Sequence, residues 1–189
     1  YQKGKEYSIH KRRKDSLDNP DEILFDVNPM AESHAYYKLG GLSVSPNNEM
    51  CTFGVDNVSR RIYTIQIKDL KTGEILADKI ENTTGGSVWA ADNQTLFYTR
   101  KDDALRAFQI WKHKLGTPAE EDTLVFEETD DTFSVYVYKS KSRDFIIIGT
   151  SSTVSDEYRY INANQPDSEF KVFQERERDL EYSIEHFGE

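Results

Sequence analysis

The sequence predicts an all-β protein, a partial β-propeller of four-stranded antiparallel blades, and three observations carry this prediction. First, the chain repeats itself at an offset of 45 residues without a gap for over thirty positions, so that Gly40-Gly41 aligns with Gly85-Gly86. Second, a weaker third copy follows at an offset of 49 to 50, in which Trp89 aligns with Tyr138. Third, each copy alternates short runs of β-branched and aromatic residues with turn residues. A period of about 40 to 50 residues with strands inside each copy is typical of propeller blades.

The first complete copy, residues 40–81, contains four expected strands. Pro46 presets φ in the turn after the first strand, and the asparagines that follow tolerate the turn conformation. A second turn at Lys71–Glu74 contains a glycine and joins the last two strands. The expected strands are Leu42–Ser45, Met50–Val55, Arg61–Ile67 and Ile75–Ile80.

The next two copies, residues 85–128 and 132–175, follow the same plan. Alternation places apolar side chains on one face of each strand, as Tyr63, Ile65 and Ile67 show in the first copy. We expect these faces to pack blade against blade. The expected strands are Ser87–Ala90, Thr95–Thr99, Ala107–His113 and Thr123–Phe126, followed by Phe133–Tyr138, Phe145–Thr150, Tyr158–Asn162 and Phe170–Phe173.

Both ends of the chain read as parts of further blades. Residues 1–28 contain the expected strands Glu6–Lys11 and Glu22–Val27, which we interpret as the outer two strands of an earlier blade. Residues 180–189 contain Tyr182–Phe187, interpreted as the innermost strand of the next blade. The stretch Ala31–Leu39 reads equally as one helical turn or as an extended loop. The prediction is therefore about three complete blades with parts of two more, cut from a longer protein.

The composition indicates which classes of partner and which cellular compartment suit this protein. The chain carries 24 Lys and Arg against 34 Asp and Glu, and this net charge of −10 disfavours nucleic acid. No run approaches the ~18 apolar residues of a membrane span, so we expect no membrane partner. The single cysteine, Cys51, excludes an internal disulfide and favours a reducing compartment, which predicts a cytoplasmic protein. The chain begins at Tyr1 instead of a methionine, which leaves room for a removed leader.

The charge is unevenly spread along the chain. Residues 1–14 are rich in Lys and Arg, whereas residues 120–131 carry seven acidic side chains and no basic one. One interpretation is that these segments are solvated loops and edge strands. The other is an acidic surface that attracts cationic ligands over a long range.

No motif in the chain assembles a catalytic site. The nearest match to a nucleophile elbow, Gly149–Thr153, lacks the closing glycine. The four histidines are not spaced for zinc, and residues 120–131 lack the central glycine of a calcium loop. Trp89 and Trp111 are expected in the core instead of at a ligand. We therefore expect no catalytic residue, no metal and no cofactor within these residues.

Several stretches, in order along the chain, resemble the N-terminal propeller of the oligopeptidase B (protease II) group in the prolyl oligopeptidase family. The resemblance covers nearly the whole chain. The matching stretches are Arg60–Tyr63, Lys68–Glu74, Ile80–Gly86, Trp89–Asn93, Phe97–Lys101, Trp111–Thr117, Tyr138–Ser142 and Glu157–Arg159.

The resemblance implies a seven-bladed propeller that caps an α/β-hydrolase domain, which is absent from this chain. That domain would carry Ser, Asp and His and cleave short cationic peptides after Arg or Lys by acyl transfer. The propeller would act as a filter that excludes folded proteins. The alternative from another class is a freestanding interaction propeller with no enzyme attached.

The resemblance and the blade plan together indicate which face meets the hydrolase domain. In a four-stranded blade, the loop after the second strand and the connection to the next blade lie on the same face. The charges, backbone donors and glycines of these segments suit a close contact. The alternative is that Gly85 and Gly86 only begin the next strand. The candidate interdomain or gating face comprises Arg60, Arg61, Glu81, Asn82, Thr83, Thr84, Gly85 and Gly86.

A partial propeller leaves one blade face open at each end. Unpaired strand edges beside exposed aromatic side chains recruit other chains. We therefore expect the 189-residue chain to associate with itself through its open blade edges.

Overall fold

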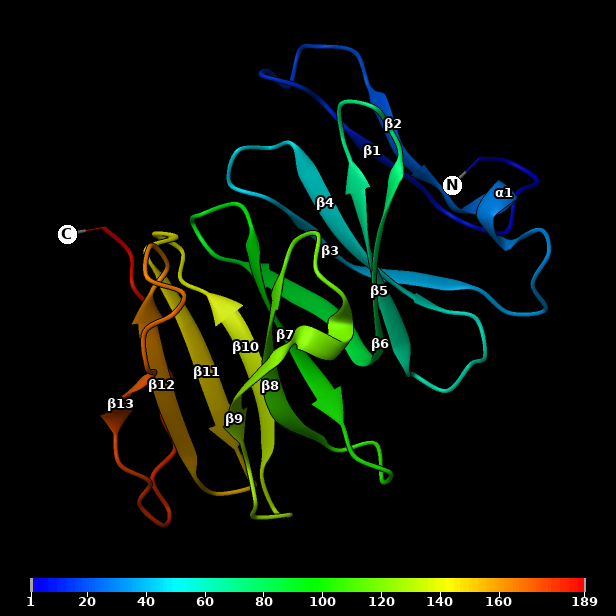
Figure 1. Cartoon of the computed structure of the whole chain (residues 1–189). Helices are drawn as coiled ribbons and strands as arrows, with labels where there is room; N and C mark the ends of the chain where they lie inside the picture. Colours follow the sequence, from blue (N-terminus) through cyan, green and yellow to red (C-terminus); the bar gives the residue numbers. More distant parts are fainter. Residues whose placement is uncertain (1, 189) are drawn as a thin grey trace.

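The computed structural model describes residues 2–188 and contains three antiparallel sheets, which lie side by side in Figure 1. The chain opens with a two-stranded sheet of β1 (Ile9–Arg12) and β2 (Glu22–Asp26), followed by the short helix α1 (Val27–Ala31). The other helical element described is the single 3-10 turn η1 (Ala119–Glu121). The expected all-β class is confirmed.

A seven-stranded sheet forms the middle of the molecule, with its strands in sequence order. One strand, β6, is 15 residues long and serves two blades: Ile80 pairs with Ile65 of β5, and Trp89 pairs with Leu96 of β7. We call residues 38–82 blade A and residues 83–127 blade B. The strands are β3 (Lys38–Val44), β4 (Met50–Asp56), β5 (Tyr63–Asp69), β6 (Ile75–Trp89), β7 (Thr95–Lys101), β8 (Ala107–Lys114) and β9 (Thr123–Glu127).

The continuity of β6 corrects one expectation. The segment Glu81–Gly86 was expected to be a loop between two separate blades, and it lies inside a strand instead. Thr83 pairs with Tyr63 on one side and with Arg100 on the other, so the backbone exchanges partners without leaving the strand. The pairing register shifts between Thr83 and Ser87, and Gly85 adopts a φ of +93° there, which a glycine tolerates.

The third sheet, which we call blade C, comprises residues 134–174. Its strands are β10 (Ser134–Lys139), β11 (Phe145–Ser151), β12 (Asp156–Asn162) and β13 (Lys171–Gln174), again in sequence order. Each of the three blades thus has four antiparallel strands, close to the expected positions.

The repeat is visible in the backbone of the turns. In each copy, the amide that ends the first strand donates to a carbonyl five positions later: Ser45 to Met50 at 2.9 Å, Ala90 to Thr95 at 2.8 Å and Ser140 to Phe145 at 2.9 Å. The residue three positions after the donor has a positive φ in every copy: Asn48 at +60°, Asn93 at +60° and Arg143 at +68°. The offsets of 45 and 50 therefore relate equivalent turns.

The core lies between the blades. Phe97 and Ile110 of blade B and Ile146 and Ile148 of blade C are fully buried in one cluster. The β1–β2 sheet covers blade A through Phe25, whose ring lies 4.6 Å from the ring of Phe53. Burial of these apolar faces supplies most of the stabilisation, as the alternation of the strands predicts.

The C-terminal segment differs from the expected strand, whereas the expected strands Glu6–Lys11 and Glu22–Val27 correspond to β1 and β2. No strand is assigned between residues 175 and 188, so the predicted innermost strand Tyr182–Phe187 is wrong. This segment lies extended against blade C, where Tyr138 donates to the carbonyl of Ile184 at 2.6 Å. It has no second strand of its own blade to pair with. Ala31–Leu39 proves mixed, because α1 ends at Ala31 and β3 begins at Lys38; Tyr1 and Glu189 lie outside the described residues.

Candidate functional site

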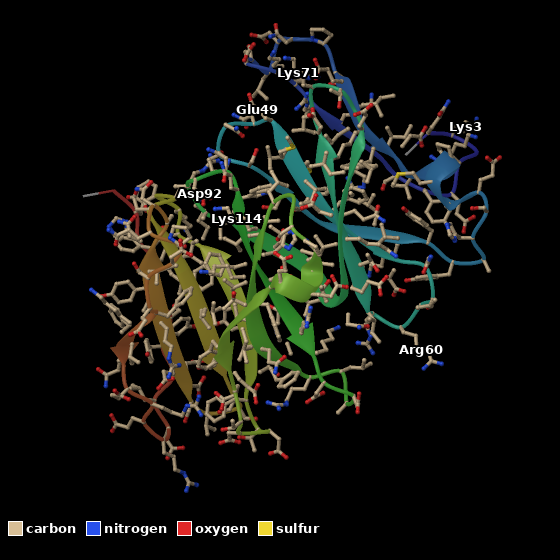
Figure 2. All side chains as sticks on the ribbon, in the orientation of Figure 1. Lys3, Glu49, Arg60, Lys71, Asp92 and Lys114 are labelled. Carbon is tan, nitrogen blue, oxygen red and sulfur yellow. The ribbon has the colours of Figure 1, made fainter. Side chains whose placement is uncertain are left out.

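The side chains of the predicted face extend from one end of the blades. Arg60 lies at this end, whereas Glu49, Lys71 and Asp92 lie at the opposite end (Figure 2). Arg60, Arg61, Glu81 and Asn82 are exposed, whereas Thr83 and Gly85 are buried. The eight residues therefore divide into four exposed polar or charged residues, a buried pair that serves the fold, and the half-buried Thr84 and Gly86.

An aspartate holds the two arginines on a rigid turn. Asp56 Oδ2 accepts from the amide of Arg61 at 2.8 Å, and its Oδ1 accepts from the amide of Val58 at 3.0 Å. Burial acts to raise the pKa of Asp56, but the surrounding backbone amides outweigh it and lower that pKa overall. Arg61 has a φ of +56°, a conformation that this capping stabilises.

Lys101 of blade B joins this turn to the neighbouring blade. Its Nζ donates to the carbonyl oxygen of Arg61 at 2.6 Å. Burial, and then repulsion from Arg61, lower the pKa of Lys101. The structure therefore brings Arg61 and Lys101 together as a cationic pair.

The buried part of the predicted face has a packing role. Thr83 Oγ1 donates to the carbonyl of Tyr63 at 2.9 Å and accepts from the amide of Gly85 at 3.0 Å. A Cβ on Gly85 would lie 2.7 Å from the ring of Tyr63, whereas nothing lies within 4 Å of a Cβ on Gly86. Glu81, on the exposed side, is paired with Lys79 at 2.7 Å.

The repeated arginine is used differently in blade B. Arg106 aligns with Arg61 in the repeat, and its amide likewise donates to an aspartate, Asp102, at 2.9 Å. Its side chain, however, turns inward and donates to the carbonyl oxygens of Asp130 at 3.1 Å and Phe133 at 2.9 Å. Arg106 thereby fastens the connection between blades B and C, while Arg61 stays exposed.

A buried polar cluster escaped the sequence analysis. His113 Nδ1 lies 2.6 Å from Asp122 Oδ1, and its Nε2 lies 3.0 Å from Asp78 Oδ1. Tyr98 donates to Asp122 Oδ2 at 2.7 Å, and the amide of Gly116 donates to Asp78 at 2.6 Å. The side chains of His113 and Asp122 have no solvent exposure.

Both ring nitrogens of His113 face a carboxylate, and a carboxylate only accepts. Burial acts to lower the pKa of His113, but the hydrogen bonds to Asp122 and Asp78 outweigh it and raise that pKa above 6.5. Burial, and then the contact with Asp122, raise the pKa of Tyr98. The cluster is therefore a clamp that joins blade A to blade B.

Five of the seven acidic residues in 120–131 are exposed, in line with the interpretation as solvated loops, but Asp122 and Glu128 are not. Asp122 meets His113, and the buried Glu128 is paired with Arg176 from beyond blade C. One signal was available: His113 lies two positions from the core candidate Trp111, on the same face of its strand. A buried histidine requires a partner, but its partners lie far away in the sequence.

One further Ser–His–Asp grouping lacks catalytic geometry. Ser142 Oγ lies 2.8 Å from His186 Nδ1, and Asp144 Oδ2 lies 3.8 Å from the same nitrogen. In a catalytic triad, the serine and the acid contact opposite ring nitrogens. Within residues 2–188, no group of three or more His, Cys, Asp or Glu side chains is arranged to hold a metal ion. No helix in that range is long and apolar enough to cross a membrane.

Known proteins resemble this chain over nearly its whole length. Residues 1–189 match the family described as "Prolyl oligopeptidase, N-terminal beta-propeller domain". The chain is 39% identical to dipeptidyl aminopeptidase BI of Pseudoxanthomonas mexicana and 33% identical to protease 2 of Moraxella lacunata, with 98% of the chain covered in each case. It spans 28% of the length of each of these relatives.

Solved structures show the same relationship. Oligopeptidase B from Leishmania major superposes with a TM-score of 0.91 at 28% identity, over 98% of this chain and 27% of that one. Oligopeptidase B from Trypanosoma brucei, in a closed form with covalently bound antipain, superposes with a TM-score of 0.87 at 26% identity, with the same coverage.

Proposed function

This chain belongs to the prolyl oligopeptidase family, as part of the N-terminal β-propeller domain, and from that membership we propose that it gates substrate access in a serine oligopeptidase. The proposed parent enzyme cleaves short peptides after Arg or Lys. Its Ser, His and Asp lie outside this chain, in a C-terminal α/β-hydrolase domain. The observation that carries the proposal is the superposition on oligopeptidase B from Leishmania major over 98% of the chain.

We assign the contact with that domain to the exposed residues Arg60, Arg61, Glu81 and Asn82. The assignment is supported by the rigid turn that presents both arginines and by the exposed Lys79–Glu81 pair nearby. Charged side chains on a rigid support suit a contact that forms and breaks as an enzyme admits substrate. Short peptides pass this contact, and folded proteins do not.

The 39% identity to dipeptidyl aminopeptidase BI favours a second candidate function, the release of dipeptides from a free amino terminus. The two activities differ in what they require of the substrate. A dipeptidyl aminopeptidase needs a free α-amino group two residues before the cut, whereas an oligopeptidase accepts a blocked amino terminus.

Chromogenic peptide amides test the proposal on the full-length protein. We expect turnover of amino-blocked substrates with Arg or Lys before the cut and at least about 100-fold lower kcat/KM with Phe there, since a buried acidic pocket discriminates strongly. Turnover confined to unblocked dipeptide amides would establish the second function instead. Absence of turnover, together with absence of labelling by a serine-directed fluorophosphonate, would favour a freestanding interaction propeller.

The 189-residue chain by itself serves as the negative control, and we expect no turnover from it. We also propose a cytoplasmic location, which rests on the single cysteine. Fractionation of cells that express the full-length protein checks this, and recovery from the periplasm or the medium would contradict it.

A further inference from the structure

A pocket of about 560 Å³ lies between blades A and B. This volume is in the range of sites that bind small ligands. Blade A contributes one wall from β6, blade B contributes the opposite wall from β7 and β8, and η1 closes a third side. The residues that matter for its chemistry are Lys79, Glu81, Arg100, Trp111, Ala119 and Glu120.

Arg100 is the half-buried cation of this pocket. Its guanidinium carbon lies 4.2 Å from the centre of the Trp111 ring and 5.6 Å from that of Tyr98. The indole is held in place because Trp111 Nε1 donates to Gln109 at 2.9 Å. The guanidinium plane is therefore supported by aromatic rings and kept in one orientation.

One nitrogen of the Arg100 guanidinium lacks an acceptor. Its Nε is buried, and no hydrogen-bond partner for it exists among the described residues. The nearby Asp122 is already engaged by His113 and Tyr98, and Glu81 is engaged by Lys79. A buried N–H without an acceptor carries a desolvation penalty. A bound oxyanion would instead pair with the other N–H groups of the guanidinium.

The rim of the pocket has mixed charge. Lys79 and Glu81 form an ion pair whose side chains are 58% and 59% exposed, and Glu120 is also exposed. Exposed ion pairs contribute little and exchange partners readily. The site thus offers an arginine with one unpaired nitrogen inside, an apolar wall of Trp111 and Ala119, and carboxylates at the entrance.

We propose that this pocket binds a short peptide by its C-terminal carboxylate, with Arg100 as the counter-ion. The planar guanidinium matches a carboxylate in a bidentate contact. The last side chain of the peptide lies against Trp111 and Ala119, and a free amino group lies near Glu120. The site lies apart from the catalytic residues proposed for the parent enzyme, but its rim shares Glu81 and Asn82 with the face assigned to the hydrolase domain, so access to it rests on that proposed contact.

Titration of the full-length protein with the dipeptide Ala-Phe and with Ala-Phe amide, followed by calorimetry, tests the proposal. The protein is first treated with a serine-directed covalent inhibitor, so that binding at a catalytic site is not counted. We expect Ala-Phe to bind and its amide to bind at least about tenfold more weakly, because the charged hydrogen bonds to Arg100 are lost. We expect Arg100→Gln to weaken Ala-Phe to the same extent.

Lys112→Gln is the matched control. Lys112 is adjacent to Trp111 in β8 but points to the other face of the blade, where it is paired with Asp167. We expect its variant to bind Ala-Phe as the wild type does. If Arg100→Gln fails to fold, Arg100→Lys keeps the charge without the planar fork, and we expect severalfold weaker binding from it.

Three results would overturn the proposal. The first is equal binding of the acid and the amide. The second is undiminished binding by a folded Arg100 variant. The third is no detectable binding of Ala-Phe up to about 10 mM, well above the range of a useful site, which would indicate that another part of the protein occupies the pocket.

Discussion

Gly41 and Gly85 approach so closely that a Cβ on Gly41 would lie 1.9 Å from the carbonyl oxygen of Gly85. Gly41 belongs to β3 and Gly85 to β6, the innermost strands of blades A and B. Gly54 of β4 joins them, since its Cβ would lie 2.6 Å from the same oxygen. The three glycines let two blades meet backbone to backbone.

Gly41→Ala should therefore destabilise the protein strongly. The added methyl group meets rigid backbone, and Gly41 also has a φ of +63°, so we expect a loss of about 3 kcal/mol or more in the free energy of unfolding. Urea unfolding measures this. Gly73→Ala is the control, because Gly73 has a φ of +81° with nothing within 4 Å, and we expect about 1 kcal/mol from it. Equal losses for the two variants would refute the close approach.

The His113 clamp predicts a pH dependence of stability. The pKa of His113 is raised in the folded protein, so the contribution of the protonated ring is complete below the unfolded pKa of about 6.5 and is lost as pH rises through the folded pKa. The groups that face the ring are Asp78 and Asp122, with Tyr98 behind Asp122. We expect the free energy of unfolding to fall as the pH rises above about 6.5.

His113→Gln should remove that slope and lower stability by about 3 kcal/mol near pH 6, because two buried carboxylates lose their cation. His34→Gln serves as the control, since His34 is exposed. A wild-type profile that stays flat over this range, or a slope retained in His113→Gln, would contradict the clamp.

The assigned interdomain face predicts kinetic effects without unfolding. In the full-length protein, Arg60→Ala, Arg61→Ala and Glu81→Ala should each change kcat/KM for peptide amides by about threefold to tenfold, as exposed charges at a contact do. Their melting temperatures should stay close to that of the wild type, because these side chains are exposed. Lys71→Ala, at the opposite end of blade A, should leave the kinetics unchanged (Figure 2). Wild-type kinetics in all three variants would remove the assignment.

The 189-residue chain alone should associate with itself. Blade C presents Phe173 at 59% exposure and Tyr136 at 40%, and β13 has one unpaired edge. We expect the mass from light scattering to rise with concentration. A constant monomer mass at high concentration, without binding of an apolar dye, would show that these exposed surfaces do not cause association and would contradict the prediction. Since Tyr182–Phe187 lies against its own blade C, exchange of this segment between copies would first have to displace it.

The sequence predicted what depends on local pattern. Alternating residues such as Ile65 and Ile67, together with turns repeated at a constant offset, located the strands of all three blades to within a few residues. The continuity of β6 could not be predicted, because Thr83 and Gly85 read as turn residues until two neighbouring strands are present to pair with them.

The two carboxylates that contact His113 could not be predicted from the sequence for a related reason. Asp78 and His113 are 35 residues apart, and only the stacking of blade A on blade B brings them together. Asp122 sits in an acidic stretch whose composition favours solvent exposure, and the hydrogen bonds from His113 and Tyr98 override that tendency. Pairing between distant polar side chains is a property of the assembled blades.

The shared strand β6 makes the two junctions between blades mechanically unequal. Blades A and B cannot separate without breaking the backbone hydrogen bonds of a continuous strand on at least one side of Thr83. Blades B and C are joined by residues 128–133, a loop that the side chain of Arg106 holds at its carbonyl oxygens. We therefore expect motion between blades to concentrate at the second junction, where a loop replaces the shared strand and depends on the contacts of one arginine.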